Sequence, residues 1–186
     1  MLTIEKAGVA EQAIQKSRFY ACAGHCETER EVGLFLRELA ALHQNAHHLA
    51  YAFRIKTADG IIPRFSDAGE PSGTAGKPIL QMLEARDLIH VAVGVIRYYG
   101  GINLGTGGLA RAYGGTAKMA LDAAKTVAFV EMRAVTISVQ YNQIDTLTRS
   151  VAQLKGKVLD KQFDQVIQVK VSLPASEADA FIHRFT

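Results

Sequence analysis

The chain of 186 residues carries 21 Lys plus Arg against 18 Asp plus Glu, a formal net charge of +3, and 48% of its residues are hydrophobic. These values are typical of a globular protein with one large domain or two small ones, so disorder is not expected. No apolar run approaches the roughly 20 residues that span a bilayer, and residues 1–16 lack the apolar core of a secretory signal. We therefore expect a cytoplasmic protein without a membrane anchor, whose slight positive charge permits an anionic partner without requiring one.

The first 133 residues alternate strands and helices around a glycine-rich stretch between residues 60 and 115. A strand over residues 18–26 precedes a helix over 28–43, in which Thr28 and Glu31 form a capping box. Residues 49–57 and 61–65 form a hairpin with its turn at Asp59-Gly60. The remaining elements are a helix over 77–85, a strand over 89–99 that is apolar on both faces, a helix over 109–125 and a strand over 127–132.

Residues 134–186 lack such glycine loops and have a simpler order of elements. We expect a strand over 135–141, a helix over 145–155, strands over 158–163 and 166–173, and a helix that Pro174 begins. This βαββα order is that of a ferredoxin-like domain without its final strand. The fold class is therefore α+β with two domains, residues 1–133 and 134–186. The first strand of the second domain would form an exposed sheet edge, to which a protein partner could add a strand.

The sequence predicts neither a metal site nor a cofactor. Cys22 and Cys26 cannot build a disulfide framework. On a strand that rises about 3.3 Å per residue they lie about 13 Å apart, too far to share a zinc ion, and His25 points to the other face.

Two glycine-rich segments each precede a helix, where backbone amides and the helix dipole can hold an anion. The first, at Gly76-Lys77, fails as a P-loop because prolines stand at two of the motif positions. The second contains Gly105, Gly107 and Gly108 and matches a dinucleotide-binding pattern, but it lies too far beyond its strand. The favoured interpretation is that these glycines are needed for their backbone conformation. Simple anion capture by the amides of this second turn remains open.

Cationic and aromatic side chains gather around these turns: Lys77, Arg97, Tyr98, Tyr99, Arg111 and Lys118. A guanidinium group beside an aromatic ring suits contact with a phosphate and a base. The pattern therefore predicts an anion-binding or nucleic-acid-binding face. An equally weighted alternative is that Arg97 forms a buried structural pair with Asp67 or Glu70.

Asp67, Glu70 and His48 carry the alternative, catalytic interpretation. Two carboxylates and an imidazole around an anion held by the second glycine turn could serve a hydrolase or transferase with a small phosphorylated or peptide substrate. Loop carboxylates three residues apart more often cap turns, however. A non-enzymatic binding protein is therefore favoured, and enzymatic activity is left open.

The motifs that hold these residues resemble the YigZ/IMPACT family, in its bacterial two-domain form. The resemblance rests on FSDAGEPSGTAGKP at residues 65–78, on RYYGG and LGTGG within residues 97–108, on SRF at 17–19 and on His48 before YAF at 51–53. Where bacterial members commonly show two acidic residues after the serine, this chain has Asp67-Ala68. The resemblance implies an N-terminal domain like the second domain of ribosomal protein S5, and a ferredoxin-like domain like the last domain of elongation factor G.

Eukaryotic members of this family are translation regulators, so the resemblance implies a function in translation. We therefore expect a regulatory or binding protein that contacts RNA or a ribosome-associated factor through the basic face of the two glycine loops. This expectation requires that the lysine and arginine side chains beside the two glycine loops are exposed to solvent and lie on one surface.

Overall fold

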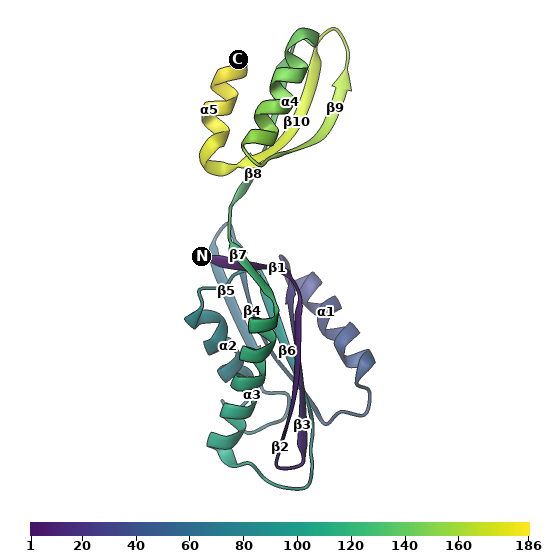
Figure 1. The fold of residues 1–186 in the computed structure, drawn as a ribbon, viewed down its shortest axis with the longest axis vertical. Helices are drawn as coiled ribbons and strands as arrows, with labels where there is room; N and C mark the ends of the chain where they lie inside the picture. Colours follow the sequence, from purple (N-terminus) through teal and green to yellow (C-terminus); the bar gives the residue numbers. More distant parts are fainter. The chain divides into compact units, whose positions relative to one another are not determined.

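The computed structural model describes residues 1–186 as two units, Met1–Phe129 and Val130–Thr186. The elements of the first unit are β1 (Leu2–Lys6), β2 (Gly8–Ile14), β3 (Ser17–His25), α1 (Glu29–Leu42), β4 (His48–Thr57), β5 (Gly60–Ser66), α2 (Gly76–Ala85), β6 (Val91–Tyr98), α3 (Gly105–Ala123) and β7 (Lys125–Ala128). An antiparallel sheet in the order β2-β3-β6-β4-β5 forms its centre, and β1 pairs with β7 in a separate ribbon. Figure 1 shows α1 on one side of this sheet and α2 with α3 on the other.

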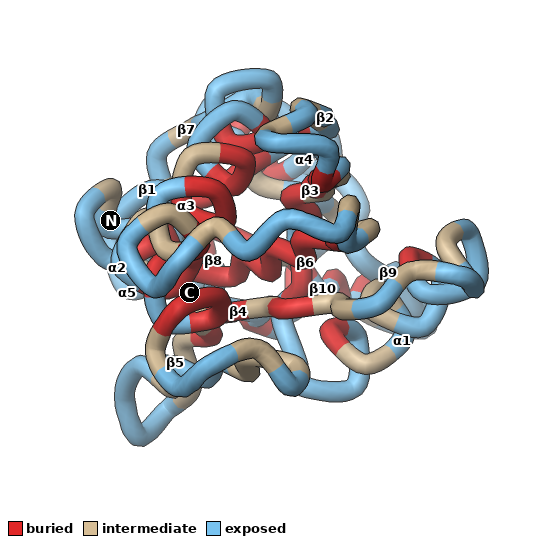
Figure 2. The backbone as a smooth tube through the Cα atoms, turned by 90° about the horizontal axis from the view of Figure 1, so that it is seen from below, coloured by how far each residue is buried: buried red, intermediate tan, exposed pale blue.

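The central strand β6 is buried from Val91 to Arg97, and the buried tube segments of Figure 2 run through it. Because successive side chains alternate between faces, Val93 and Val95 contribute to the core beneath α2 and α3 while Ala92 faces the smaller core beneath α1. This two-sided burial explains the continuous apolar run of the strand. Near the end of the strand, Arg97 therefore lies on the side of α3 and Tyr98 on the side of α1.

The helix α1 begins after Thr28, as predicted, but only half of the predicted capping box is present: the Glu31 carboxylate accepts from the Glu27 backbone N–H and not from that of Thr28. The Thr28 side chain accepts a hydrogen bond from the Glu31 backbone N–H at 3.1 Å, and this satisfies one of the free amides of the first turn. The helix packs closely because a Cβ at Gly24 would overlap the ring of Phe35, and one at Gly94 would overlap Leu39. Both glycines thus remove side chains that would hold the helix away from the sheet.

Residues 1–16, to which the sequence analysis assigned no strand, form β1 and β2. The hairpin between β2 and β3 turns at Gln15 and Lys16, which are not glycines although their φ angles are 44° and 68°. Helix α3 begins at Gly105, four residues earlier than the predicted Leu109. Low helix propensity of glycine masked this first turn, so three of the predicted loop glycines belong to the helix.

The second unit contains β8 (Met132–Val139), α4 (Ile144–Gln153), β9 (Lys157–Phe163), β10 (Ile167–Pro174) and α5 (Ala175–Phe185). The sheet order is β8-β10-β9, and both pairings are antiparallel. The predicted βαββα order is confirmed, with β8 at an edge of the sheet. Its core gathers Leu147 of α4, Phe181 of α5 and alternate residues of the strands. None of the helices in the chain is long and apolar enough to cross a membrane.

Replacement of Gly8 by Ala should destabilise the first unit, because the added Cβ would overlap the Ala120 carbonyl of α3, a backbone atom that cannot move aside. We expect a loss of about 1–3 kcal/mol in the free energy of unfolding, measured by urea denaturation. The matched control is Gly33→Ala in α1, whose Cβ would meet only the flexible end of Arg37. That change should raise helix stability by about 0.5–1 kcal/mol. Equal effects of the two substitutions would contradict this packing.

Candidate functional site

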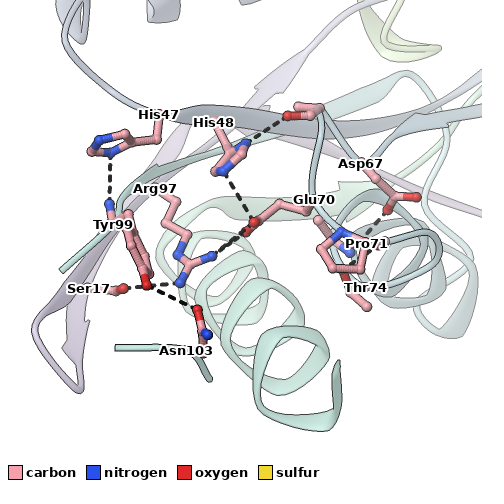
Figure 3. A network of polar contacts seen from close by, with 12 residues as sticks. Ser17, His47, His48, Asp67, Glu70, Pro71, Thr74, Arg97, Tyr99 and Asn103 are labelled. Atoms are coloured by element: carbon pink, nitrogen blue, oxygen red, sulfur yellow. Dashed lines mark hydrogen bonds and ion pairs between the residues drawn. The ribbon is translucent and has the colours of Figure 1, made fainter. Parts of the chain in front are cut away.

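Four segments of the first unit meet at one end of the central sheet. They are residues 12–19, 42–48, 66–77 and 97–111, and we call this region the glycine-loop end. Direct contacts join them: the Arg97 guanidinium donates to Ser17 Oγ at 3.3 Å, and the His47 backbone N–H donates to the Arg97 carbonyl at 3.1 Å. The Tyr99 backbone N–H in turn donates to His47 Nδ1 at 2.9 Å. Figure 3 shows that Glu70, in the loop before α2, points toward Arg97 at the end of β6.

A buried ion pair between Glu70 and Arg97 joins the two loops. Nη1 of Arg97 lies 2.7 and 2.9 Å from the two carboxylate oxygens of Glu70, and both side chains are only 5% exposed. The guanidinium also lies over the rings of Phe19 and Tyr99. The prediction that Arg97 is a phosphate contact is therefore wrong, and its alternative, a buried structural pair with Glu70, describes the structure.

His48 of β4 is the third member of this network. Its Nδ1 lies 2.8 Å from the Ala68 carbonyl oxygen and its Nε2 lies 3.2 Å from Glu70 Oε1. The ring therefore contacts both the loop backbone and the buried Glu70 carboxylate. These contacts hold the start of the loop, where Ala68 adopts a φ of 51° and Gly69 one of 85°.

Tyr113 of α3 completes the network, and the sequence analysis missed it. Its hydroxyl donates to Glu70 Oε2 at 2.7 Å, and its ring is fully buried edge-on against Phe19. Burial, together with the hydrogen bond to Glu70, raises the pKa of the Tyr113 hydroxyl. No local motif marks this residue, because its partner lies 43 positions away in a loop.

Asp67 occupies the N-terminus of α2. Its carboxylate accepts hydrogen bonds from the backbone N–H groups of Gly73, Ala75 and Gly76 at 2.8, 3.1 and 2.9 Å. Burial alone would raise the pKa of this carboxyl, but these amide hydrogen bonds outweigh it and hold the pKa below its ordinary value. The first glycine turn therefore already holds an anion, which is a side chain of the protein itself.

The second glycine turn differs from the first. Gly105, Gly107 and Gly108 lie in the first turn of α3, and no side chain caps this helix end. The amides of a first helical turn lack partners within the helix. The interpretation of simple anion capture, which the sequence left open for this second turn, thus retains a structural basis.

The two tyrosines of the predicted stacking surface lie on opposite faces of the sheet. Tyr98 hydrogen-bonds His43 at 2.8 Å and packs against Tyr20 on the side of α1, so it lies on the opposite face of the sheet from Arg97. Tyr99 is 41% exposed, and its hydroxyl donates to Asn103 at 3.0 Å. The alternation of side chains along β6 separates these neighbours, and Tyr99 remains as the exposed ring.

Among the predicted basic contacts, Lys77 and Arg111 are exposed at the glycine-loop end, whereas Lys118 is not part of it. Lys118 forms an i,i+4 ion pair with Asp122 at 2.9 Å. It also lies thirteen residues along α3 from Gly105, or about 20 Å at the rise of an α-helix. Lys16 of the neighbouring hairpin, which the sequence pattern did not single out, is an exposed cation of the same end. Arg18 is also exposed, but it lies on the side of α1, where it pairs across the strands with Tyr98 and its guanidinium lies over the Tyr20 ring.

The geometry does not favour the catalytic interpretation of Asp67, Glu70 and His48. A general base needs a free lone pair that faces the substrate. Asp67 is engaged by three backbone amides, and Glu70 is buried by Arg97, Tyr113 and His48. These groups act as internal supports of the loop.

The cysteines lie apart from this end of the sheet. Cys26 is buried in the core beneath α1, where burial raises its pKa to about 11, and burial also raises the pKa of Cys22. Neither thiol therefore has the low pKa of a reactive cysteine.

Replacement of Asp67 by Asn should lower the free energy of unfolding by about 1–2 kcal/mol near neutral pH, since a charged acceptor at the N-terminus of α2 is lost. The depressed pKa gives the sign of the pH dependence. The stabilisation is complete above the ordinary carboxyl pKa of 3.8 and is lost as the pH falls through the lower value of the folded state. The difference between wild type and Asp67→Asn, measured by denaturation at a series of pH values, should therefore shrink in acid. A difference that is constant with pH would contradict this role.

Replacement of Arg97 by Ala should cost about 3–5 kcal/mol of stability, because it leaves the Glu70 carboxylate buried without its cation. A double-mutant cycle with Glu70→Gln, read by urea denaturation, should show strong coupling between the two sites. Additive losses would mean that the two side chains do not interact as the structure indicates.

Comparison with known proteins agrees with this architecture. The Impact N-terminal domain family matches residues 15–121, and a domain of unknown function, DUF1949, matches residues 137–186. The chain is 34% identical over 171 residues to the IMPACT family member YigZ of Escherichia coli, covering 91% of this chain and 84% of that protein. It is 44% identical over 131 residues to an IMPACT family member of Thermus thermophilus, covering 70% of this chain and 69% of that protein.

A solved structure supports the same assignment for both units. The crystal structure of a hypothetical protein superposes with a TM-score of 0.73 at 32% identity, covering 98% of this chain and 89% of that one. Because these matches extend over both units and include the motifs at the glycine-loop end, the chain belongs to the IMPACT family.

Proposed function

We propose that this protein is a non-enzymatic, translation-associated regulatory protein that binds single-stranded RNA phosphates at the glycine-loop end. The observation that carries the proposal is the distribution of charge at this end. Apart from Arg18, which lies on the side of α1, its exposed charged side chains are Lys16, Lys77 and Arg111, and all of them are cationic. Cationic surfaces of this kind attract nucleic acid through its phosphates.

The buried network is the reason that the surface is cationic. Glu70 is neutralised inside the protein by Arg97, and Asp67 is turned toward the amides of α2. Neither carboxylate therefore presents its charge as an open surface anion. The unpaired amides of the first turn of α3 and the exposed ring of Tyr99 lie at the same end, which supports contact with phosphate and with a base.

Membership of the IMPACT family supports a function in translation, because eukaryotic members of the family are translation regulators. A ribosome-associated protein is the competing partner. The two partners differ in a measurable property, since binding to RNA phosphates releases counterions and weakens steeply as salt increases.

Arg111→Ala should weaken the binding of a single-stranded RNA and reduce the slope of log affinity against log salt by about 1, as expected for the loss of one phosphate contact. Fluorescence anisotropy at several salt concentrations measures both quantities. Lys118→Ala is the matched control on the same helix, because that lysine is paired with Asp122.

Co-sedimentation with ribosomes over the same salt series tests the setting. Binding to ribosomes that persists at high salt and is unchanged by Arg111→Ala would indicate a protein partner. Absence of binding to both RNA and ribosomes would contradict the proposal.

A further inference from the structure

A recess of about 350 Å³ lies between strand β2 and the first three turns of α3. It is distinct from the buried Glu70 network and opens at the glycine-loop end. Its volume falls within the range of small-ligand sites, which begins at about 300 Å³. The space exists because α3 presents Gly108, Ala112 and Gly115 along one stripe toward β2. A Cβ at Gly115 would meet only the amide of Gln12, at 3.8 Å.

The lining of the recess combines apolar walls with amides and one guanidinium group. Ile14 and Leu104 supply apolar surface, while Gln12, Gln15 and Arg111 supply the polar groups. Gln12 donates one hydrogen bond to Thr116 at 2.7 Å, which fixes the orientation of its amide and leaves the carbonyl oxygen as an acceptor. Carboxamide side chains that carry both donors and acceptors suit the edge of a nucleobase, and a guanidinium group at the rim suits the attached phosphate.

The hairpin turn between β2 and β3, which lies beside the recess, has a strained backbone, an observation independent of the recess's volume and lining. Gln15 and Lys16 occupy a two-residue hairpin turn with φ angles of 44° and 68°, positions that asparagine and glycine fill at lower cost. Strain of this kind concentrates at functional sites. It also has a visible result, since the Gln15 side chain lines the recess and Lys16 is an exposed cation next to it. The Lys16 carbonyl packs against Gly100, where a Cβ would overlap it, so the turn is fixed to the second glycine loop.

We infer that this recess receives one unpaired nucleobase of a single-stranded RNA whose phosphates lie along Lys16 and Arg111. The inference rests on the proposed function and adds to it the part of the RNA that is recognised. Phosphate contacts alone would bind any polyanion, whereas a base seated between β2 and α3 makes binding depend on the presence of bases.

The test uses the full chain and two fluorescent decamers, an oligoadenylate and a sugar-phosphate decamer of the same length without bases. Wild type should bind the oligoadenylate about tenfold more tightly than the abasic decamer, as expected for one seated base. Gly115→Leu fills the recess and should reduce this preference several-fold while the salt slope remains unchanged. Gly33→Leu places the same substitution in the interior of α1 and should leave the preference intact.

A second variant covers the case in which Gly115→Leu does not fold. Gln15→Gly relieves the positive φ and removes the amide from the recess, so it should raise the thermal midpoint and reduce the preference for oligoadenylate. Equal binding of both decamers by wild type would overturn the nucleobase recess and leave the phosphate-binding proposal standing. A preference that is undiminished in folded Gly115→Leu or Gln15→Gly protein would also overturn the recess. Absence of binding to either decamer at low salt would overturn the proposed function itself.

Discussion

The ion pair between Glu70 and Arg97 is the interaction on which the glycine-loop end depends. A buried carboxylate or guanidinium would be strongly destabilising alone, so each requires the other. The pair is further enclosed by the hydroxyl of Tyr113, the imidazole of His48 and Ser17. It thereby connects β3, β4, β6, α3 and the loop before α2 through groups that are distant in the sequence. A loop of glycines and small polar residues acquires a single conformation from this one buried contact.

The same contact determines which charges reach the solvent. By neutralising Glu70 inside the protein, it removes a negative charge from the surface, and Asp67 is similarly engaged at the N-terminus of α2. The exposed charges that remain are lysines and arginines. A structural support and a cationic surface are therefore two consequences of one arrangement, since the residues that shape the loops also leave their outer face cationic.

The two glycine-rich turns illustrate how similar sequences can have different roles. Both precede helices, and both would attract an anion through the helix dipole. At α2 the anion is supplied by Asp67, which makes this turn a closed capping structure. At α3 no side chain caps the first turn, and a recess opens beside it. The difference depends on the carboxylate of Asp67, which reaches the backbone N–H of Gly76, nine residues further along the chain.

The sequence by itself determined most of the secondary structure and the order of the two domains. The two-sided apolar run of β6, the cap at Thr28 and the βαββα order of the second unit are local patterns. Such patterns can be recognised without knowing which other segments pack against them. The strands β1 and β2 and the first turn of α3 could not be found in this way. Strand β1 is completed by pairing with the distant strand β7, and the β2–β3 hairpin turns at Gln15 and Lys16, which are not typical turn residues. At α3, glycine weakens the helical signal.

Only the tertiary structure decided the roles of the charged residues. Arg97 and Arg111 are chemically identical, yet one is buried against Glu70 and the other is exposed, because burial depends on which elements pack against a position. Tyr98 and Tyr99 are adjacent, yet the pleat of the strand sends them to opposite faces. The sequence supplied the residues of the candidate site, and the packing of α3 on the sheet determined which of them can meet a ligand.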